Sequence, residues 1–416
     1  MRVLHLATTY PLHAGDSNAT FVASIADGLA ARGHECDVLV PWHPDLQVER
    51  PGGVRVIGFR YSPFRGWHPW GYAQALTADR KLRPDAYLAA PLAALSARRW
   101  IQRLHQDRPY DLLHAHWFLP NGAIGASAWR RTGLPLVVSC HGSGVFLAEK
   151  HSWAARIGRY VKQHATTVTA CSADLAERFD ALGAGPPATR IPYGVDTQRF
   201  APLAAAARAA RRVELAARHG LRTDALWVFA IGRLVFKKGF DVLVQAAAAA
   251  LGAGADLEVI LAGAGPLETD LRELAAASGV GERVHLLGAV PNADVPAYYA
   301  ASDVAAVPSV HGPDGNVDGL PNTLLESLSS GVAVVASRVA GIPDVLRDQD
   351  NGLLFPEGDV EALAGHLSTL ARDRHLAADL GLRARLDAVE RLDWEHAVTR
   401  FERVYELACS PGGGGR

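Results

Sequence analysis

The sequence has few cysteines, little net charge and no long hydrophobic run, and each of these scarcities excludes a class of protein. Its 416 residues include four cysteines that stand far apart, Cys36, Cys140, Cys171 and Cys409. Because none forms a C-x-x-C pair, neither a zinc knuckle nor a disulfide framework is indicated, and reduced thiols in a cytoplasmic protein are expected. The formal net charge of −1 argues against electrostatic attraction to nucleic acid.

Hydrophobic stretches are short everywhere along the chain. The first one, residues 3–7, is too short for the hydrophobic region of a signal peptide and is typical of a first buried strand. No stretch approaches about 18 uninterrupted apolar residues, so no membrane span is expected. Hydrophobic residues nevertheless make up 49% of the chain, which predicts a folded protein.

Short apolar runs alternate with helical patterns throughout the sequence, which predicts parallel sheets covered by helices on both faces. The predicted strands cover residues 3–7, 36–40, 112–115, 136–140, 167–171, 189–191, 226–231, 257–262, 284–286, 304–307, 333–336 and 353–355. Predicted helices between them include residues 21–31, 174–182, 203–218 and 266–278. Two such sets predict the α/β class, with two Rossmann-like, doubly wound domains.

The break between the two domains is predicted near residues 192–202, where proline and glycine interrupt both periodicities. We expect an N-terminal domain over residues 1–197, a second domain over 198–385, and a C-terminal helix within 386–410 that returns to the first domain. Residues 411–416, PGGGGR, are expected to form a loose tail. Ligands of doubly wound sheets sit beyond the C-terminal strand ends, so functional residues should follow strands.

A basic loop follows the strand that ends at Ile231. Its sequence, GRLVFKKG over residues 232–239, carries Arg233, Lys237 and Lys238. A guanidinium offers a forked set of donors and an ammonium offers a point charge, and together they suit a diphosphate. The alternative is a solvated basic loop without a ligand.

The second motif covers residues 308–331, where a glycine-rich loop with an acidic residue, Asp318, leads into a predicted helix. Pro321 is expected at the first helical position, and Glu326 lies eight residues after Asp318. On that helix a carboxylate could accept hydrogen bonds from two ribose hydroxyls, or it could merely offset the helix dipole. The amide donors expected to be available to phosphate oxygens belong to Asn322, Thr323 and Leu324.

Polar residues also follow strands in the first half of the chain. Gly15 lies in the loop after the first strand and could let the backbone approach a donor, while Asp16 and Asn18 could contact an acceptor. His141 ends a later strand, and a single histidine there can equally be structural. His114 and His116 flank one residue at a strand end. A metal pair is conceivable, but no third ligand is evident, so a buried or acceptor-side role is favoured.

With these motifs in place, the chain resembles the family 4 glycosyltransferases, which have the GT-B fold. The resemblance covers nearly the whole chain and is most specific in IGRLVFKKGFDVLVQA, VILAGAGPLETDL, LLGAVPNADVPAYYAASDVAAVPS and DGLPNTLLESLSSGVAVVASRVAGIPDVL. It implies two domains around an interdomain cleft, a nucleotide-diphosphate sugar as substrate, and neither a cofactor nor a metal. It also implies transfer with retention of configuration.

The resemblance assigns roles to individual residues. Arg233 and Lys238 match the phosphate ligands, and Lys237 is the weaker match. Asp318 matches the acid that contacts the donor sugar, although glutamate is commoner there, and Glu326 matches the ribose ligand. The remaining matches are His141 as the active-site histidine, Gly319 beside the first acid, and Val290 within the backbone that frames the base.

The same motifs are compatible with two other functions. A nucleotide-sugar 2-epimerase shares the fold, and a non-catalytic nucleotide-sugar-binding protein would share the site. The triplet Asp348-Gln349-Asp350 could indicate a metal-dependent transferase, but it precedes an Asn-Gly turn and is interpreted as a surface loop. The acceptor could be a glycan, a lipid-linked sugar or a small molecule. A cytoplasmic location is expected, and the aromatic segment Trp67–Trp70 is either a packed loop or a membrane or glycan contact.

Overall fold

A computed structural model describes residues 1–13, 15–16, 18–48, 52–62, 64, 66–72, 83–183, 185–313 and 315–410. The tail expected at residues 411–416 lies outside this part of the chain. The chain forms two compact units, Met1–Tyr193 with Trp394–Arg416, and Gly194–Asp393. The first crossing therefore falls four residues before the expected boundary at 197, and the return falls eight residues after the expected start at 386.

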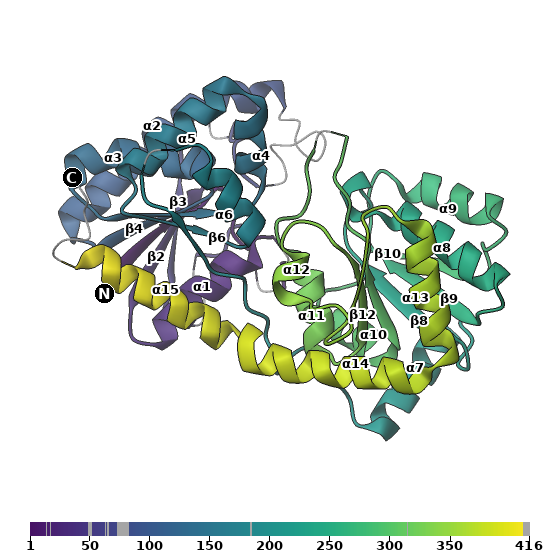
Figure 1. The fold of residues 1–416 in the computed structure, drawn as a ribbon. Coiled ribbons are helices and arrows are strands. Elements are labelled where there is room, and N and C mark those ends of the chain that lie inside the picture. The colour runs from purple at the N-terminus through teal and green to yellow at the C-terminus, as the bar shows by residue number, and fades with distance from the viewer. Residues whose placement is uncertain are drawn as a thin grey trace. The chain divides into compact units, whose positions relative to one another are not determined.

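The first unit is built on a parallel sheet with the strand order β3-β2-β1-β4-β5-β6-β7 (Figure 1). Its strands are β1 Arg2–Leu6, β2 Glu35–Pro41, β3 Arg55–Phe59, β4 Leu112–His116, β5 Leu136–Cys140, β6 Thr167–Ala170 and β7 Ala188–Arg190. β1 and β4, which are far apart in sequence, pair directly, with His5 opposite His114. The chain therefore winds outward from the middle of the sheet in both directions, as in doubly wound folds.

Helices cover both faces of this sheet. They are α1 Thr20–Ala31, α2 Pro84–Asp107, α3 Ala123–Thr132, α4 Ser143–Lys150, α5 Ser152–His164, α6 Ala173–Asp180 and α15 Trp394–Cys409. The last helix lies beside α1 and buries Val398, Phe401 and Tyr405 in the same core as β1 and β2. Their spacing of three and four residues places them on one helical face, which explains why the C-terminal segment packs against the first unit.

The second unit repeats this plan with a sheet of the order β10-β9-β8-β11-β12-β13. Its strands are β8 Leu226–Ile231, β9 Leu257–Ala262, β10 Val284–Gly288, β11 Val304–Val307, β12 Ala333–Ser337 and β13 Leu353–Phe355. Its helices are α7 Ala205–His219, α8 Phe240–Gly252, α9 Glu268–Ala277, α10 Val295–Ala301, α11 Asn322–Ser329, α12 Ile342–Val345, α13 Val360–Arg372 and α14 Arg374–Asp387. The predicted α/β class with two doubly wound sheets is confirmed.

Sequence patterns missed one strand, β3, and misplaced the ends of others by one or two residues. β3 reads RVIGF and pairs with β2 from Asp37↔Arg55 to Pro41↔Phe59. Its apolar run is short and is interrupted by Gly58, which weakens the strand pattern. The strand is held by its hydrogen-bonded pairing with β2, which the local sequence does not indicate.

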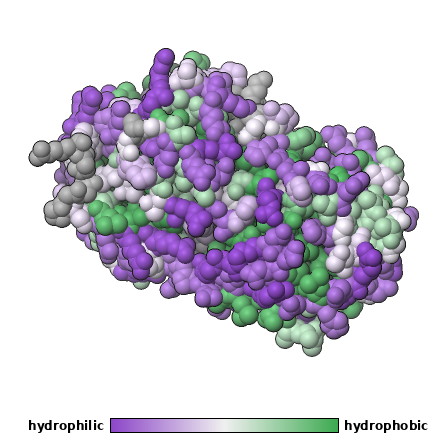
Figure 2. Space-filling model, viewed as in Figure 1, coloured by the Kyte–Doolittle hydropathy of each residue, from purple (hydrophilic) through white to green (hydrophobic). Residues whose placement is uncertain are grey.

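No helix in the described part of the chain is long and apolar enough to cross a membrane. The face of the molecule in Figure 2 is mostly hydrophilic, with apolar residues in scattered groups. The segment Trp67–Trp70 is partly buried: the Tyr61 hydroxyl donates to the Trp70 carbonyl at 3.1 Å, and His68 packs edge-on against Trp42 and Tyr61. This segment is therefore a packed loop.

Candidate active site

The second unit places its candidate residues at the point where its sheet changes direction. β8 lies next to β11, and the chain runs to β9 and β10 on one side and to β12 and β13 on the other. The loops after β8 and β11 leave the same sheet edge with no strand between them, which is where open α/β sheets bind ligands. The basic loop follows β8, and the loop that carries Asp318 follows β11.

Two glycines allow the loops of this edge to lie close together. A Cβ atom on Gly263 would come 1.8 Å from the Gly232 carbonyl oxygen, so the loop after β9 can lie against the basic loop only without a side chain there. Gly239 adopts φ +62° and would clash in the same way with the Pro308 carbonyl oxygen at 1.9 Å. The Gly263-Ala264-Gly265 segment is thus a packing element between loops.

Asp318 is held by two lysines of the basic loop. The ammonium nitrogen of Lys238 lies 2.6 Å from one carboxylate oxygen of Asp318, and that of Lys237 lies 3.0 Å from the other. All three side chains are mostly buried, with 13% to 18% of their surface exposed. Burial alone would raise the pKa of Asp318, but the charges of Lys238 and Lys237 outweigh it and lower this pKa well below its usual range.

The structure corrects two details of the α11 entrance. Pro321 lies at the N-cap position with ψ 125°, one residue before the predicted position, and α11 begins at Asn322. The amide of Leu324 donates to the Pro321 carbonyl at 3.1 Å, so it is not available to phosphate. A tight first turn consumes that donor. The first-turn amides of Asn322 and Thr323 keep the geometry of open helix-end donors.

Glu326 lies on α11 beside a tyrosine that sequence reasoning missed. Tyr299, from α10, is buried, donates to the Thr323 carbonyl at 3.2 Å and lies within hydrogen-bonding reach of Glu326. Burial raises the pKa of Glu326 to about 7, against the opposing effects of Arg199, Lys238 and this hydrogen bond. Burial and the nearby carboxyl group also raise the pKa of Tyr299 well above its ordinary value.

The remaining predicted residues of this unit lie on the same edge. Arg233 is exposed and follows β8, Gly319 is buried next to Asp318, and Val290 is partly buried just after β10. Gly319 accepts a hydrogen bond from the Gly341 amide at 2.9 Å, which ties the loop after β11 to the loop after β12. The predicted donor residues of the second unit are therefore brought to one sheet edge.

In the first unit the loop after β1 is organised by Asp16. Its carboxylate accepts hydrogen bonds from the Leu12 amide at 2.8 Å, the Asn18 amide at 3.0 Å and the Asn18 side chain at 2.8 Å. Asp16 and Asn18 thus bond to each other and shape the loop. Gly15 adopts φ +89°, and nothing lies within 4 Å of the position that a Cβ atom would take there.

His141 lies just beyond β5, and its two ring nitrogens have partners. Nδ1 lies 2.7 Å from the Tyr193 hydroxyl, and Nε2 lies 3.2 Å from His116 Nδ1. Phe21 packs against the ring at a centroid distance of 4.6 Å. Burial lowers the pKa of His141 to about 3, so the ring is neutral at physiological pH.

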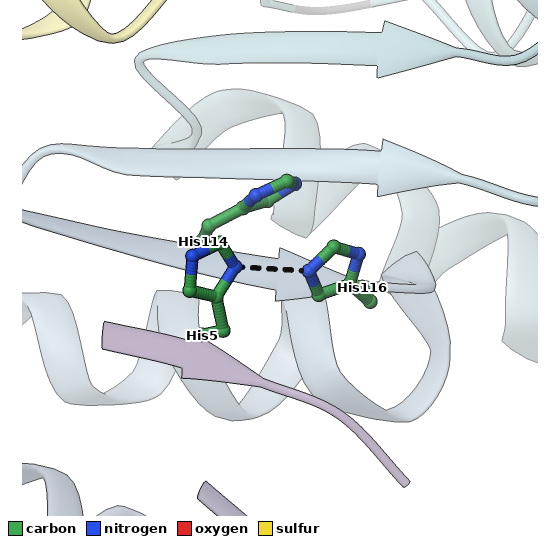
Figure 3. A group of neighbouring side chains, drawn as sticks. All are labelled: His5, His114 and His116. Carbon is green, nitrogen blue, oxygen red and sulfur yellow. Dashed lines mark hydrogen bonds between the residues drawn. The ribbon is translucent and has the colours of Figure 1, made fainter. Parts of the chain in front are cut away.

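The structure corrects the assignment of His116 to the acceptor side. This side chain is fully buried, between His141 and His5, so it cannot touch an acceptor. Figure 3 shows His5, His114 and His116 gathered around β1 and β4, and one nitrogen of each lies within 4.8 Å of the others. His5 is the third histidine that the sequence pattern did not reveal. Its signal was its position in the strand that neighbours the H-x-H pair.

These histidines are better explained by hydrogen bonds than by a metal. The two nitrogens of His114 lie 2.6 Å from the Tyr405 hydroxyl and 2.7 Å from the Ser139 hydroxyl. The remaining pair, His5 Nδ1 and His116 Nε2, face each other at 3.2 Å. Metal ligands direct their lone pairs at a common point rather than at each other.

Two comparisons with known proteins identify the family. Residues 19–199 match the family described as Glycosyltransferase Family 4, and residues 225–373 match Glycosyl transferases group 1. A GDP-mannose-dependent alpha-(1-6)-phosphatidylinositol monomannoside mannosyltransferase of Mycolicibacterium smegmatis is 30% identical, over 83% of this chain and 88% of that protein. The chain belongs to glycosyltransferase family 4.

Further matches agree with this assignment. A D-inositol 3-phosphate glycosyltransferase of Acidothermus cellulolyticus is 32% identical, over 94% of this chain and 85% of that protein. The structure of sucrose-phosphate synthase from Thermosynechococcus elongatus superposes with a TM-score of 0.77 over 97% of this chain and 98% of that one, at 20% identity. That likeness shows the GT-B fold. The chain is a glycosyltransferase of the hexosyl-transferring class.

The D-x-D triplet of this family 4 glycosyltransferase lies away from the candidate donor residues. It precedes β13, the edge strand of the sheet, which β12 separates from β11 and from the loop that carries Asp318. Asp348 accepts hydrogen bonds from Arg338 at 3.1 Å and the Leu354 amide at 2.9 Å. Asp350 is paired with Arg347. The triplet therefore shapes a turn, as the sequence indicated.

Ionisation of Glu326 is expected to cost stability as the pH rises. Its pKa is about 7 in the folded protein and about 4.3 when unfolded, so stability falls with pH between these values. From pH 6 to pH 8 the loss should be about 1 kcal/mol, and Glu326→Gln should remove it. Urea unfolding at both pH values measures it, with the exposed Glu361→Gln as the control. Equal pH dependence in the wild type and in Glu326→Gln would contradict this account.

Proposed function

We propose that this glycosyltransferase moves a hexose from a nucleotide-diphosphate sugar to a hydroxyl group of its acceptor, with retention of configuration and without a metal ion. The observation that carries the proposal is the cluster of Lys237, Lys238 and Asp318 at the switch point of the second sheet. The two lysines and Arg233 form a concentrated positive charge on a rigid sheet edge, which suits a diphosphate.

The donor would be divided among the elements of this edge. Arg233, Lys238 and the amides of Asn322 and Thr323 would bind the diphosphate, and Glu326 would accept hydrogen bonds from the ribose. Asp318 would contact the transferred sugar after the lysines turn toward the phosphates. The backbone at Val290, just after β10, would lie along the base. Lys237 also lies beside Asp318, at 3.0 Å, so it would bind the diphosphate together with Lys238.

Catalysis would then rest on electrostatic stabilisation of the leaving diphosphate. Preorganised cations and amides stabilise the negative charge that develops as the glycosidic bond breaks. No carboxylate among the described residues of the second unit is placed for a nucleophilic role on its own, because Asp318 is engaged by two lysines. We favour a front-face route in which a donor phosphate oxygen takes the proton of the acceptor hydroxyl.

The first unit would supply the acceptor side, through the loop shaped by Asp16 and through His141. The relatives act, by their names, on phosphatidylinositol monomannoside and D-inositol 3-phosphate, so an inositol-containing or lipid-linked acceptor is proposed. α2 offers a surface for peripheral association with the inner face of the membrane. Its exposed Leu88, Leu92 and Leu95 are followed, one to about four turns later, by the exposed Arg99 and Arg103, a pattern that suits an anionic lipid surface.

A transfer assay tests the proposed reaction. GDP-mannose and UDP-sugars are offered with inositol 3-phosphate or with phosphatidylinositol vesicles, and the product's anomeric configuration is determined by NMR. Retention is expected, and activity should persist in EDTA. Inversion, or strict dependence on Mn²⁺ or Mg²⁺, would contradict the proposal.

Membrane association is tested by sedimenting the protein with phosphatidylinositol vesicles. The double substitution Leu88→Ser with Leu92→Ser should reduce the fraction that sediments, whereas Val213→Ser, at an exposed residue of α7, serves as the control.

Removing one phosphate ligand should slow turnover strongly. Arg233→Ala or Lys238→Ala is expected to lower kcat by roughly 10²–10³, as for the loss of one preorganised donor. Steady-state kinetics with the best donor of the screen measure this effect. The matched control is Arg272→Ala, because Arg272 is an exposed cation of α9 in the same unit. Turnover close to that of the wild type in either variant would remove the phosphate assignment.

Asp318 should behave differently from the phosphate ligands. Asp318→Asn removes the counter-charge of both lysines, so binding of the bare nucleoside diphosphate should be preserved or strengthened, while turnover falls or the ranking of donor sugars changes. Glu326→Gln should instead weaken the diphosphate and the full donor alike, by roughly 1–3 kcal/mol. Calorimetry with GDP and UDP separates the two acids. Loss of diphosphate binding in Asp318→Asn, with intact binding in Glu326→Gln, would reverse the assignment.

A further inference from the structure

A row of buried histidines lies behind His141. His141 Nε2 faces His116 Nδ1 at 3.2 Å, and His116 Nε2 faces His5 Nδ1 at 3.2 Å. His5 and His116 have no exposed surface. We call His5, His116 and His141 the histidine row. It runs from the strand β1, through the end of β4, to the residue after β5, and it ends at the Tyr193 hydroxyl 2.7 Å from His141 Nδ1.

The row consists of neutral rings. Burial lowers the pKa of His5 to about 3, against the opposing charge of Asp37, and it lowers the pKa of His141 to about 3. Burial and the neighbouring histidines lower the pKa of His116 well below its ordinary value. A neutral imidazole carries one proton, on one of its two nitrogens. Each ring of the row can therefore donate once and accept once.

Counting protons leaves two possible directions. Each contact between two rings needs one proton, because two facing lone pairs repel and two facing N–H groups collide. Either all protons point from His5 toward Tyr193, or all point from Tyr193 toward His5. The two arrangements differ at the inner end, where His5 Nε2 has no hydrogen-bond partner among the described residues. It is a bare lone pair in the first arrangement and an N–H group in the second.

Burial decides between the two arrangements. Buried N–H groups without an acceptor are rarer in proteins than buried acceptors without a donor. The protons therefore point outward, His5 Nδ1–H donates to His116 Nε2, and His116 Nδ1–H donates to His141 Nε2. His141 then carries its own proton on Nδ1, directed at the Tyr193 oxygen. The hydrogen bond at one imidazole nitrogen fixes the tautomer at the other.

We propose that His116 is a positioning residue that, backed by His5, fixes the orientation and the Nδ1–H tautomer of His141. The role of His141 near the reacting sugar rests on the proposed function, but the tautomer does not. With Nε2 occupied by His116, His141 cannot serve as a general base through that nitrogen. It acts instead as a fixed neutral dipole whose N–H points along the row to Tyr193. A rigid, uncharged group of this kind needs no reorganisation during the reaction.

Two amide substitutions at His116 separate positioning from packing. The amide nitrogen of asparagine can take the place of the donating Nδ1–H of the imidazole, and the amide oxygen of glutamine can take the place of the accepting Nε2. His116→Asn therefore keeps a donor for His141 and loses the contact with His5, whereas His116→Gln does the opposite. Glutamine fills the buried space better than asparagine. A purely structural role would make His116→Asn the more damaging change, and the positioning role predicts the reverse.

The first measurement is ¹⁵N NMR of ring nitrogens in protein labelled at histidine, assigned with His141→Gln. The wild type and His116→Asn should show His141 protonated at Nδ1 and bare at Nε2 at pH 7. His116→Gln should show a mixture of both tautomers. His141 protonated at Nε2 in the wild type, or on both nitrogens, would overturn the proposal. So would stoichiometric binding of added Zn²⁺ that shifts the rings of the row. This readout needs no substrate, so it stands even if the proposed function fails.

The second measurement is turnover in the transfer assay. His116→Gln should lower kcat by about tenfold or more, by analogy with the loss of a partner that orients a metal-bound histidine, with little change in the KM for the donor. His116→Asn should recover most of this loss, although it leaves the larger cavity. Thermal melting of both variants confirms that they are folded. Equal kcat losses in the two variants, or a greater loss in His116→Asn, would show that His116 serves only in packing and would overturn the positioning role.

Discussion

The ammonium groups of Lys237 and Lys238 share the mostly buried carboxylate of Asp318 where the second sheet changes direction. The arrangement of the loops after β8 and β11 depends on this contact. Three charges in such a place are stable only as a group, because an isolated buried charge loses its hydration without compensation. The cluster leaves a net positive charge, which a diphosphate can neutralise. In the proposed donor site, the carboxylate of Asp318 holds the two lysines in place, and it would become available to the sugar when phosphate replaces it.

This contact explains why the neighbouring backbone is rich in glycine. Lys238 reaches Asp318 from a loop that lies across Gly232, where a Cβ atom would come 3.0 Å from the lysine side chain. Gly263 and Gly239 let the loop after β9 and the Pro308 backbone approach equally closely. The glycines thus serve loop packing first. Phosphate binding, as proposed for this edge, would be a consequence of how closely these loops lie.

Sequence patterns predicted the features that a single segment determines, such as secondary structure and motif positions. They missed most contacts between segments that are distant in sequence. The alternation of strands and helices, and the positions of Arg233, Lys238, Asp318 and Glu326 after strands, follow from local periodicity and family motifs. Tyr299 beside Glu326 could not be foreseen, because α10 and α11 meet only through the fold. For His116 the sequence left a buried and an acceptor-side role open; the residue is buried, since pairing of β4 with β1 brings His5 against it. The use of the Leu324 amide is a different case, because its acceptor, the Pro321 carbonyl, lies in the same segment and the bond follows from the position of Pro321 at the N-cap.

The candidate residues of the two units are buried in opposite ways. In the second unit charges are kept and paired, so binding there responds to the charge of a ligand. In the first unit the histidines are kept neutral by burial and are joined by shared protons, so the group next to the surface has a fixed direction but no net charge. A charged site suits the diphosphate of the proposed donor. A neutral oriented site suits a sugar or an acceptor, which offers hydroxyl groups and would gain little from an ion.

Glu326 is intermediate between the charged and the neutral groups, because a carboxyl group with a pKa near 7 can bind either as a neutral donor or as an anion. The ribose that Glu326 is proposed to bind has hydroxyl groups, which can form hydrogen bonds with the neutral carboxyl group and with the carboxylate. Such a ligand allows the second unit to bury this acid without an ion pair among the described residues.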